Sequence, residues 1–435
     1  MRRLATLLAG IAALAAAPAA AQTVAITGGR VVVGDGSPPI DGGTVVIRDG
    51  RVVAAGANVP VPANAERVDA SGRWVTPGVV AGFSRIGLLE VDAEDPTNDT
   101  QAANSSFNAA IDVVPAINPQ ASSIAVSRAA GVTRAVVSPS TGRSIFGGQG
   151  ALIDLGGDMN AVTRPRLFQY VELGEEGAGD AGGSRAAAHV MFRNALREAR
   201  EEAAGRRGDN PQLTRADAIA LGPVVRGEQL LLVHVERASD ILQVLSLRRD
   251  FPALRLVLVG ATEGWRVAQD IAAARVPVIA NALNDLPASF EQLAATQSNV
   301  GRMTAAGVHV SIGMLNDDEA RQVRLSTQYA GNLVAITRVP GHTGLSWDQA
   351  FAAISSGPAE AVGLGNEIGS LRPGRRADVV IWDGDPLELA TAVEAVWIDG
   401  VRQSLENRQT RLRDRYRQPQ EGALPHAYTP RTPQP

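Results

Sequence analysis

The chain has 435 residues, of which 45% are hydrophobic, enough for one large α/β domain and a smaller appended one. Its formal net charge of −4 at pH 7 argues against nucleic acid as a main partner, because phosphate binding needs a basic face. The chain contains no cysteine and no lysine, which excludes disulfides, thiolate zinc ligands and lysine Schiff-base chemistry.

The first 21 residues are typical of a secretory signal peptide. A positive pair, Arg2-Arg3, precedes an apolar run over residues 4–17, and three alanines at 19–21 form a small-residue cleavage site before Gln22. The apolar run is too short to span a membrane, and no other run reaches that length. We expect a mature chain that begins at Gln22 in a periplasm or outside the cell, exported by ordinary secretion in preference to the twin-arginine route.

Residues 22–79 predict the first part of a small sheet. Short β-rich runs at 31–33, 44–47 and 51–55 are separated by turn residues, and Asp49-Gly50 is typical of a hairpin turn between the last two. The segment therefore forms antiparallel strands before the main domain begins.

Residues 80–365 change to alternating β runs and helical stretches, which predicts a parallel sheet. Over this length a closed (β/α)8 TIM-like barrel is the best architecture. The expected strands include residues 134–137, 230–235, 255–259, 276–280 and 308–312. The stretch from Ile145 to Asp180 must hold at least one further strand.

Residues 366–403 return to the sheet-like pattern, with β-rich runs at 378–382 and 395–398. We expect them to join residues 22–79 in one composite β-sandwich, interrupted by the barrel. Residues 404–435 form an Arg-rich helix followed by a Pro-rich tail, whose charges are those of a solvated face.

Three motifs resemble the amidohydrolase superfamily, in particular its imidazolonepropionase-like exported branch. Residues 75–80 (VTPGVV) resemble the entry into barrel strand 1, and residues 130–136 (AGVTRAV) resemble a later strand of that family. The most specific motif is residues 368–380 (IGSLRPGRRADVV), continued by DGDP at 383–386, which resembles the return into the composite sheet. The matches span most of the chain.

The resemblance implies one or two divalent metals at the carboxyl-terminal rim of the barrel, held by imidazoles and carboxylates. Most positions that would supply these ligands are substituted. The His-x-His pair of strand 1 is replaced by Phe83-Ser84-Arg85, the His of strand 6 by a residue within 258–260 (LVG), and the Asp of strand 8 by Leu315. Lysine is absent, so a carboxylated lysine on strand 4 cannot exist, although Glu172 or Glu175 could substitute for it.

His234, at the end of strand 5, is the only candidate metal ligand retained, and it is also a candidate catalytic residue. It is equally well explained as a rim histidine kept for packing. Asp317, just after Leu315, is the second candidate catalytic residue as a displaced carboxylate, although a solvated loop explains it more simply. A single imidazole cannot hold a catalytic metal, because such sites need about three protein ligands.

Acidic residues crowd the segment after strand 1, close to Arg85. Arg85, Glu90 and Asp99 are candidate substrate-binding residues: the carboxylates could take a cationic group, and Arg85 an anionic one. The simpler interpretation is an acidic solvent-exposed loop.

The resemblance implies hydrolysis of a C–N bond in a small amide, cyclic imide or dipeptide-like molecule. The expected cofactor is none, or zinc or another divalent metal if the site is rebuilt. The alternatives are a non-catalytic periplasmic ligand-binding protein on the same fold and a subunit that supports an intact paralogue. We expect a small-molecule ligand, no nucleic acid, no membrane span and a tendency to form a homo-oligomer; whether the chain is an enzyme stays open.

Overall fold

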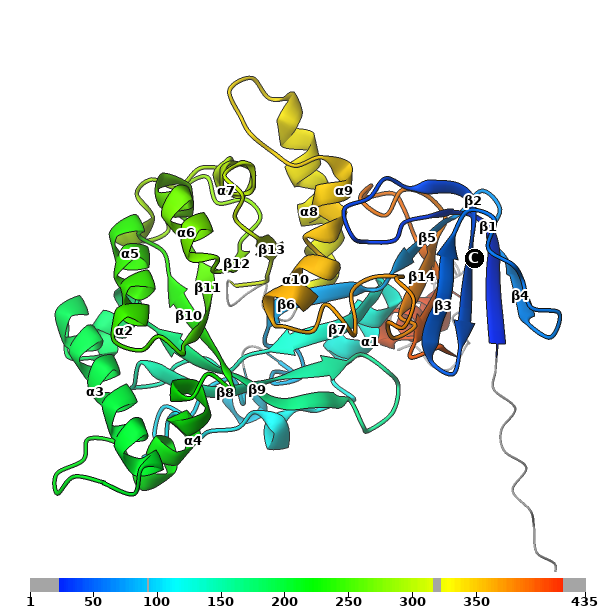
Figure 1. Cartoon of the computed structure of the whole chain (residues 1–435). Coiled ribbons are helices and arrows are strands. Elements are labelled where there is room, and N and C mark those ends of the chain that lie inside the picture. The colour runs from blue at the N-terminus through cyan, green and yellow to red at the C-terminus, as the bar shows by residue number, and fades with distance from the viewer. Residues whose placement is uncertain (1–22, 92–93, 316–321, 418–435) are drawn as a thin grey trace, which may run out of the picture.

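The computed structural model describes residues 23–91, 94–315 and 322–417. The expected signal peptide, residues 1–21, therefore lies outside the described residues. Two eight-stranded sheets organise the described chain, one at the right of Figure 1 and one at its centre and left. No helix among the described residues is both long and apolar enough to cross a membrane.

The first sheet combines strands from both ends of the chain. Its order is β16-β15-β14-β5-β1-β2-β3, with β4 paired to β1. The bounds are β1 (Thr23–Val31), β2 (Ile40–Arg48), β3 (Arg51–Gly56), β4 (Glu66–Asp69), β5 (Trp74–Pro77), β14 (Val379–Trp382), β15 (Val393–Ile398) and β16 (Val401–Arg402). The antiparallel pairing of β5 with β14, with Val75 opposite Ile381, joins the two ends as the sequence predicts.

The turn between β2 and β3 is the hairpin that Asp49-Gly50 predicts. Asp49 has φ 51° and Gly50 has φ 72°, the left-handed conformations that a two-residue hairpin turn of this type requires. Glycine and aspartate tolerate them at little cost, so the sequence sets this register locally.

The second sheet is a nearly closed barrel whose strand order, β13-β12-β11-β10-β9-β8-β7-β6, follows the chain. The strands are β6 (Val79–Ser84), β7 (Val132–Val137), β8 (Phe146–Asp154), β9 (Val162–Glu172), β10 (Leu230–Val235), β11 (Arg255–Gly260), β12 (Val278–Ala280) and β13 (Val310–Ile312). This arrangement, with the second sheet, confirms the expected α/β class with a TIM-like barrel.

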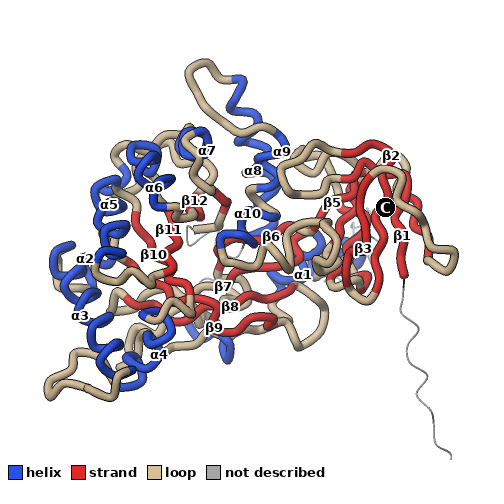
Figure 2. Tube along the Cα trace, viewed as in Figure 1, coloured by secondary structure: helices blue, strands red, loops and turns tan. Residues whose placement is uncertain are grey.

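Helices follow or flank the barrel strands, as the tube in Figure 2 shows. They are α1 (Ser122–Ala129), α2 (Glu175–Asp180), α3 (Arg185–Ala203), α4 (Arg215–Val225), α5 (Ala238–Ser246), α6 (Ala268–Ala274), α7 (Asn299–Ala305), α8 (Ser326–Ala335), α9 (Trp347–Ala352), α10 (Ser356–Ala361) and α11 (Arg408–Arg417). The longest, α3, begins at a Ser184 side chain that accepts from the Ala186 amide, and it buries one apolar stripe against the sheet.

One strand departs from the regular (β/α)8 pattern. β8 runs antiparallel to both β7 and β9, whereas the other barrel neighbours are parallel. The connections, residues 138–145 and 155–161, are too short for a parallel crossover, which needs a dozen or more residues. Two hairpin-like returns therefore replace two crossover helices in the region between Ile145 and Asp180.

The first and last barrel strands approach closely enough to bring the barrel near closure. The Met314 amide donates to the Phe83 carbonyl at 2.9 Å. Gly82 permits this approach, because a Cβ there would lie 2.6 Å from the Ile312 carbonyl oxygen. Inside the barrel, Phe83, Phe168 and Tyr170 belong to an apolar cluster that fills the lumen below the carboxyl-terminal rim.

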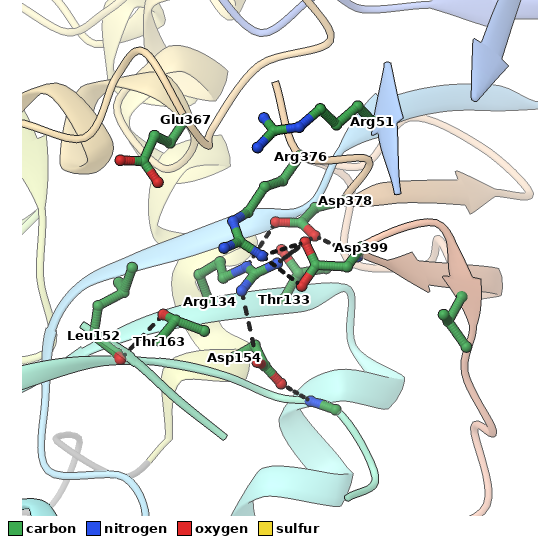
Figure 3. A network of polar contacts seen from close by, with 12 residues as sticks. Arg51, Thr133, Arg134, Leu152, Asp154, Thr163, Glu367, Arg376, Asp378 and Asp399 are labelled. Carbon is green, nitrogen blue, oxygen red and sulfur yellow. Dashed lines mark hydrogen bonds and ion pairs between the residues drawn. The ribbon is translucent and has the colours of Figure 1, made fainter. Parts of the chain in front are cut away.

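A buried guanidinium joins the two sheets. Arg134 of β7 is 0% exposed and donates through Nε and Nη2 to the Asp378 carboxylate at 2.8 and 2.9 Å. Its Nη2 also lies 2.8 Å from Asp399, and its Nη1 lies 3.6 Å from Asp154 (Figure 3). Asp378 precedes β14 and Asp399 follows β15, so a barrel strand is tied to two strands of the composite sheet.

We predict that Arg134→Met destabilises the protein strongly, because it leaves the buried Asp378 carboxylate without its cation. Loss of one partner of a buried ion pair costs about 3–5 kcal/mol. The matched control is Arg376→Met, whose guanidinium pairs with the partly exposed Asp399 alone among the described residues and should cost about 1 kcal/mol. Urea denaturation at pH 7 measures both, and equal losses in the two variants would contradict the proposed role of Arg134.

Candidate functional site

The candidate site is a cavity of about 270 Å³ at the rim where the barrel strands end. Strand ends and the loops after them supply its walls, as expected for the carboxyl-terminal face of a barrel. The lining residues are Phe83, Arg85, Ser140, Tyr170, Glu172, Glu176, His234, Glu236, Val259, Gln292 and Leu315. We call this cavity the barrel mouth.

His234 lies between two buried carboxylates at the barrel mouth. Its Nδ1 is 2.6 Å from Glu172 Oε2, and its Nε2 is 3.1 Å from Glu236 Oε1. The His234 side chain is 22% exposed, whereas those of Glu172 and Glu236 are 2% and 4% exposed. When the ring is protonated, both nitrogens donate, so the three side chains form a carboxylate–imidazolium–carboxylate group.

Strand geometry places these three side chains together. Glu172 ends β9 directly opposite His234 of β10 in the parallel register. Glu236 follows His234 by two positions, and residues two apart on a strand point to the same face. Each carboxylate is also held by a backbone amide: Gly174 donates to Glu172 at 2.8 Å and Thr262 donates to Glu236 at 2.7 Å.

The charges of this group support one another. Burial by itself lowers the pKa of His234, but the charge of Glu172, then Tyr170, and the hydrogen bonds to both carboxylates outweigh it and raise that pKa well above 6.5. Burial by itself raises the pKa of Glu236, but the hydrogen bond and charge of His234, with the Thr262 amide, leave it lowered. These interactions favour the imidazolium form of His234.

Two further carboxyl groups border the barrel mouth. Partial burial of its carboxyl group, and then the charge of Glu172, raise the pKa of Glu176, although the residue as a whole is exposed at the rim. Burial also raises the pKa of Glu291, whose carboxylate accepts from the Glu175 amide at 2.6 Å and from Arg185 at 3.1 Å. Glu176 is the one of the two that lines the cavity and can exchange a proton with a bound molecule.

The described residues of the barrel mouth are not arranged to hold a divalent metal. Within the described ranges, no group of three or more His, Cys, Asp or Glu side chains is placed so that it could hold an ion. Both ring nitrogens of His234 already face carboxylates, and Phe83, 1% exposed, fills the lumen beside Tyr170 with 5.6 Å between ring centroids. A catalytic metal site needs about three ligands that are free to coordinate. At the barrel mouth, the carboxylates of Glu172 and Glu236 are instead paired with the ring of His234.

The structure brings some of the sequence-predicted residues together and separates others. His234 and Arg85 both line the barrel mouth. Glu90 does not, because it accepts from the Asn118 side chain at 2.6 Å, and Asp99 is exposed on the same outer loop. Asp317 lies outside the described residues.

Sequence reasoning missed Glu236 and Glu176 and left Glu172 as one of two options. The period-two spacing from His234 to Glu236 on a β run was the available signal for the first. Glu176 follows a glycine-containing turn that gives no periodic signal. Gln292 reaches the barrel mouth from a distant loop, which no local pattern indicates.

Comparison with known proteins identifies related sequences. Residues 256–402 match the model of the Amidohydrolase family. The amidohydrolase tasK of Hapsidospora irregularis is 25% identical over 381 residues, which cover 79% of this chain and 38% of that protein. The imidazolonepropionase of Maricaulis maris is 37% identical over 100 residues, 22% of this chain and 23% of that enzyme. The matches thus span well under two thirds of the length of either relative.

Solved structures share the fold over nearly the whole chain. The crystal structure of an amidohydrolase from Thermotoga maritima has a TM-score of 0.77 at 24% identity and covers 87% of this chain and 99% of its own. A molinate hydrolase has a TM-score of 0.53 at 18% identity, with 88% and 95% covered. The chain therefore shares the fold of these solved structures, a barrel with a companion sheet.

We predict a pH-dependent stabilisation by His234, tested with His234→Gln. A raised His pKa contributes stability that is full below about pH 6.5 and is lost as pH rises through the folded-state pKa. The lowered Glu236 pKa contributes stability that is present above about pH 4.3 and is lost as pH falls further. The wild type should exceed the variant by about 3 kcal/mol between pH 5 and 6.5, and by less at higher pH.

Urea denaturation of both proteins from pH 5 to 10 measures this difference. His309→Gln is the matched control, because His309 lies outside the barrel mouth and bonds the Gly357 carbonyl at 2.9 Å. A His234→Gln difference that does not vary with pH would contradict the imidazolium assignment.

Proposed function

We propose that this chain, which carries an amidohydrolase-family domain on an amidohydrolase-like barrel, hydrolyses a C–N bond in a small amide, cyclic imide or dipeptide-like molecule. The observation that carries the proposal is the Glu172–His234–Glu236 group at the barrel mouth. A small cavity with a fixed imidazolium and a proton-exchanging carboxyl group is suited to acid–base chemistry on a small molecule.

In the proposed reaction, the Glu176 carboxylate takes a proton from the attacking water as oxygen adds to the substrate carbonyl. The His234 imidazolium gives a proton to the leaving nitrogen as the C–N bond breaks. The proton held by Glu176 then returns to His234 through water as the products leave, which restores both groups. Glu172 and Glu236 hold the imidazole in place and favour its protonated form. No step depends on a metal, since the described residues do not fit one.

The proposal extends to the branch and the location of the protein. The imidazolonepropionase match supports a place in the imidazolonepropionase-like branch. The leader-like first 21 residues support export, with a mature chain from Gln22 in the periplasm or outside the cell.

A non-catalytic ligand-binding protein is the second candidate. It is favoured by the fact that both nitrogens of His234 are engaged by carboxylates, which leaves neither ready for a substrate without rearrangement. The same barrel mouth would then bind a small polar molecule without turning it over.

We predict that purified protein, dialysed against zinc, manganese and calcium, retains no stoichiometric transition metal by mass spectrometry. Screened on small amides, cyclic imides and dipeptides by amine release, it should turn over one class, and a chelator should not reduce the rate. Glu176→Gln and His234→Gln should each lower kcat by about 100-fold, because each removes an acid–base group.

His309→Gln again serves as the matched control and should keep full activity. Stoichiometric zinc or manganese that is needed for turnover and lost in His234→Ala would overturn the metal-free reaction. Thermal stabilisation by a ligand that is never turned over would favour the binding protein over the hydrolase.

A further inference from the structure

A second and larger cavity lies beside α3. Its volume is about 690 Å³, against about 270 Å³ for the barrel mouth, and it lies within the range of small-molecule sites. Its walls come from α3, the start of α4, and the segments around residues 106–108 and 143–146. We call it the α3–α4 cavity. It shares no lining residue with the barrel mouth.

The irregular strand β8 explains why space exists here. In a regular barrel a crossover helix packs outside each strand pair, but the short returns before and after β8 carry no helix. The outer face near β8 is covered instead by an irregular segment of turns, in which Asp112 bridges to Gln149 and the Val113 amide donates to the Gln149 carbonyl at 3.2 Å. A chain segment without helical side-chain packing leaves a hollow against α3.

The α3–α4 cavity is held open by fixed groups. The Asp217 carboxylate, 1% exposed, accepts from the Asn108 and Ala110 amides at 2.9 and 2.8 Å and from the Thr214 hydroxyl at 2.6 Å. These bonds tie the covering segment to α4. Phe146 is buried in the cavity floor, with its ring centroid 5.9 Å from that of Phe192 of α3. A preformed hollow binds ligands without the cost of ordering its walls.

Besides polar side chains and the hydrogen-bonded Asp217 carboxylate, the lining holds an exposed apolar face and one cation. Val190 and Met191 of α3 line the cavity and are 69% and 39% exposed, and the neighbouring Phe107 is 48% exposed. Apolar side chains gathered around a hollow mark a binding surface. Arg143 lines the same cavity and is exposed, and no ion pair or hydrogen bond joins it to another described side chain. An anionic group on a bound molecule could form a charge-assisted hydrogen bond with the Arg143 guanidinium.

We infer that the α3–α4 cavity binds a small apolar molecule that carries one anionic group. The apolar body lies along Val190 and Met191 of α3, and the anion pairs with Arg143. This inference does not depend on the proposed hydrolysis, because the experiment below measures binding to the α3–α4 cavity and not enzyme activity.

The probe is anilinonaphthalene sulfonate, an apolar anion whose fluorescence rises in apolar surroundings, titrated into the purified protein. We expect saturable binding of one probe molecule. Ala187→Trp, which fills the cavity from α3, and Val190→Asp, which places a like charge on its exposed wall, should each weaken binding at least 10-fold. Arg143→Gln should weaken it about 3- to 10-fold, the range for one hydrogen bond of typical net strength.

Phenylnaphthylamine, which has the same apolar body without the sulfonate, separates the two parts of the site. Its affinity should fall in Ala187→Trp and stay within 2-fold in Arg143→Gln. The matched control variant is Leu389→Ser, which removes a side chain that is 79% exposed and lies outside the cavity, and it should bind both probes normally.

Three results would overturn the inference. The first is the absence of saturable binding, and the second is binding that neither Ala187→Trp nor Val190→Asp weakens. The third is a dimer in sedimentation analysis that Val190→Asp dissociates, because a second copy of the chain would then occupy this face.

Discussion

The structure depends on the burial of a single guanidinium, that of Arg134, between the barrel and the composite sheet. A charge with no exposed surface is tolerated only when carboxylates surround it, and Asp378 and Asp399 do so side by side at the open end of the β14–β15 hairpin. The passage from β5 to β6 crosses the same region, where the Gly78 amide donates to the Asp378 carbonyl at 3.0 Å. A Cβ at Gly78 would lie 2.0 Å from the Thr133 hydroxyl, so the chain enters the barrel only without a side chain there.

At the barrel mouth, too, buried charges are compensated by neighbours of opposite sign, and here the cation is the ring of His234. Glu172 and Glu236 are buried carboxylates on neighbouring strand ends, and the imidazolium of His234 compensates both. Each carboxylate also accepts a hydrogen bond from a backbone amide, which further stabilises its negative charge. Glu176 stands apart from it, since it is exposed and its pKa is raised, and so it supplies the variable proton of the site.

Periodicity and turn chemistry predicted most of the fold, because they act locally. The Asp49-Gly50 hairpin, the return of sheet character after residue 365 and the alternating strands and helices all follow from patterns within a few residues. The antiparallel β8 could not be predicted, since its direction depends on the length of two loops whose bounds the sequence leaves ambiguous. Prediction of the site reached His234 and Arg85, but Gln292 and the Asp378 partner of Arg134 come from segments that only the tertiary fold brings near.

The pairing of β5 with β14 also sets the order of events when the chain folds. Some 300 residues separate the two strands, so the composite sheet has a high contact order. The entropy cost of closing this loop comes before the pairing can contribute any favourable free energy. Until residues 378–399 join the fold, one edge of β5 remains unpaired and Arg134 has neither Asp378 nor Asp399 to neutralise it. Both defects are removed together by one late segment. A chain that has not yet added β14 and β15 to the sheet is therefore incompletely folded. It exposes the edge of β5, and exposed strand edges promote aggregation.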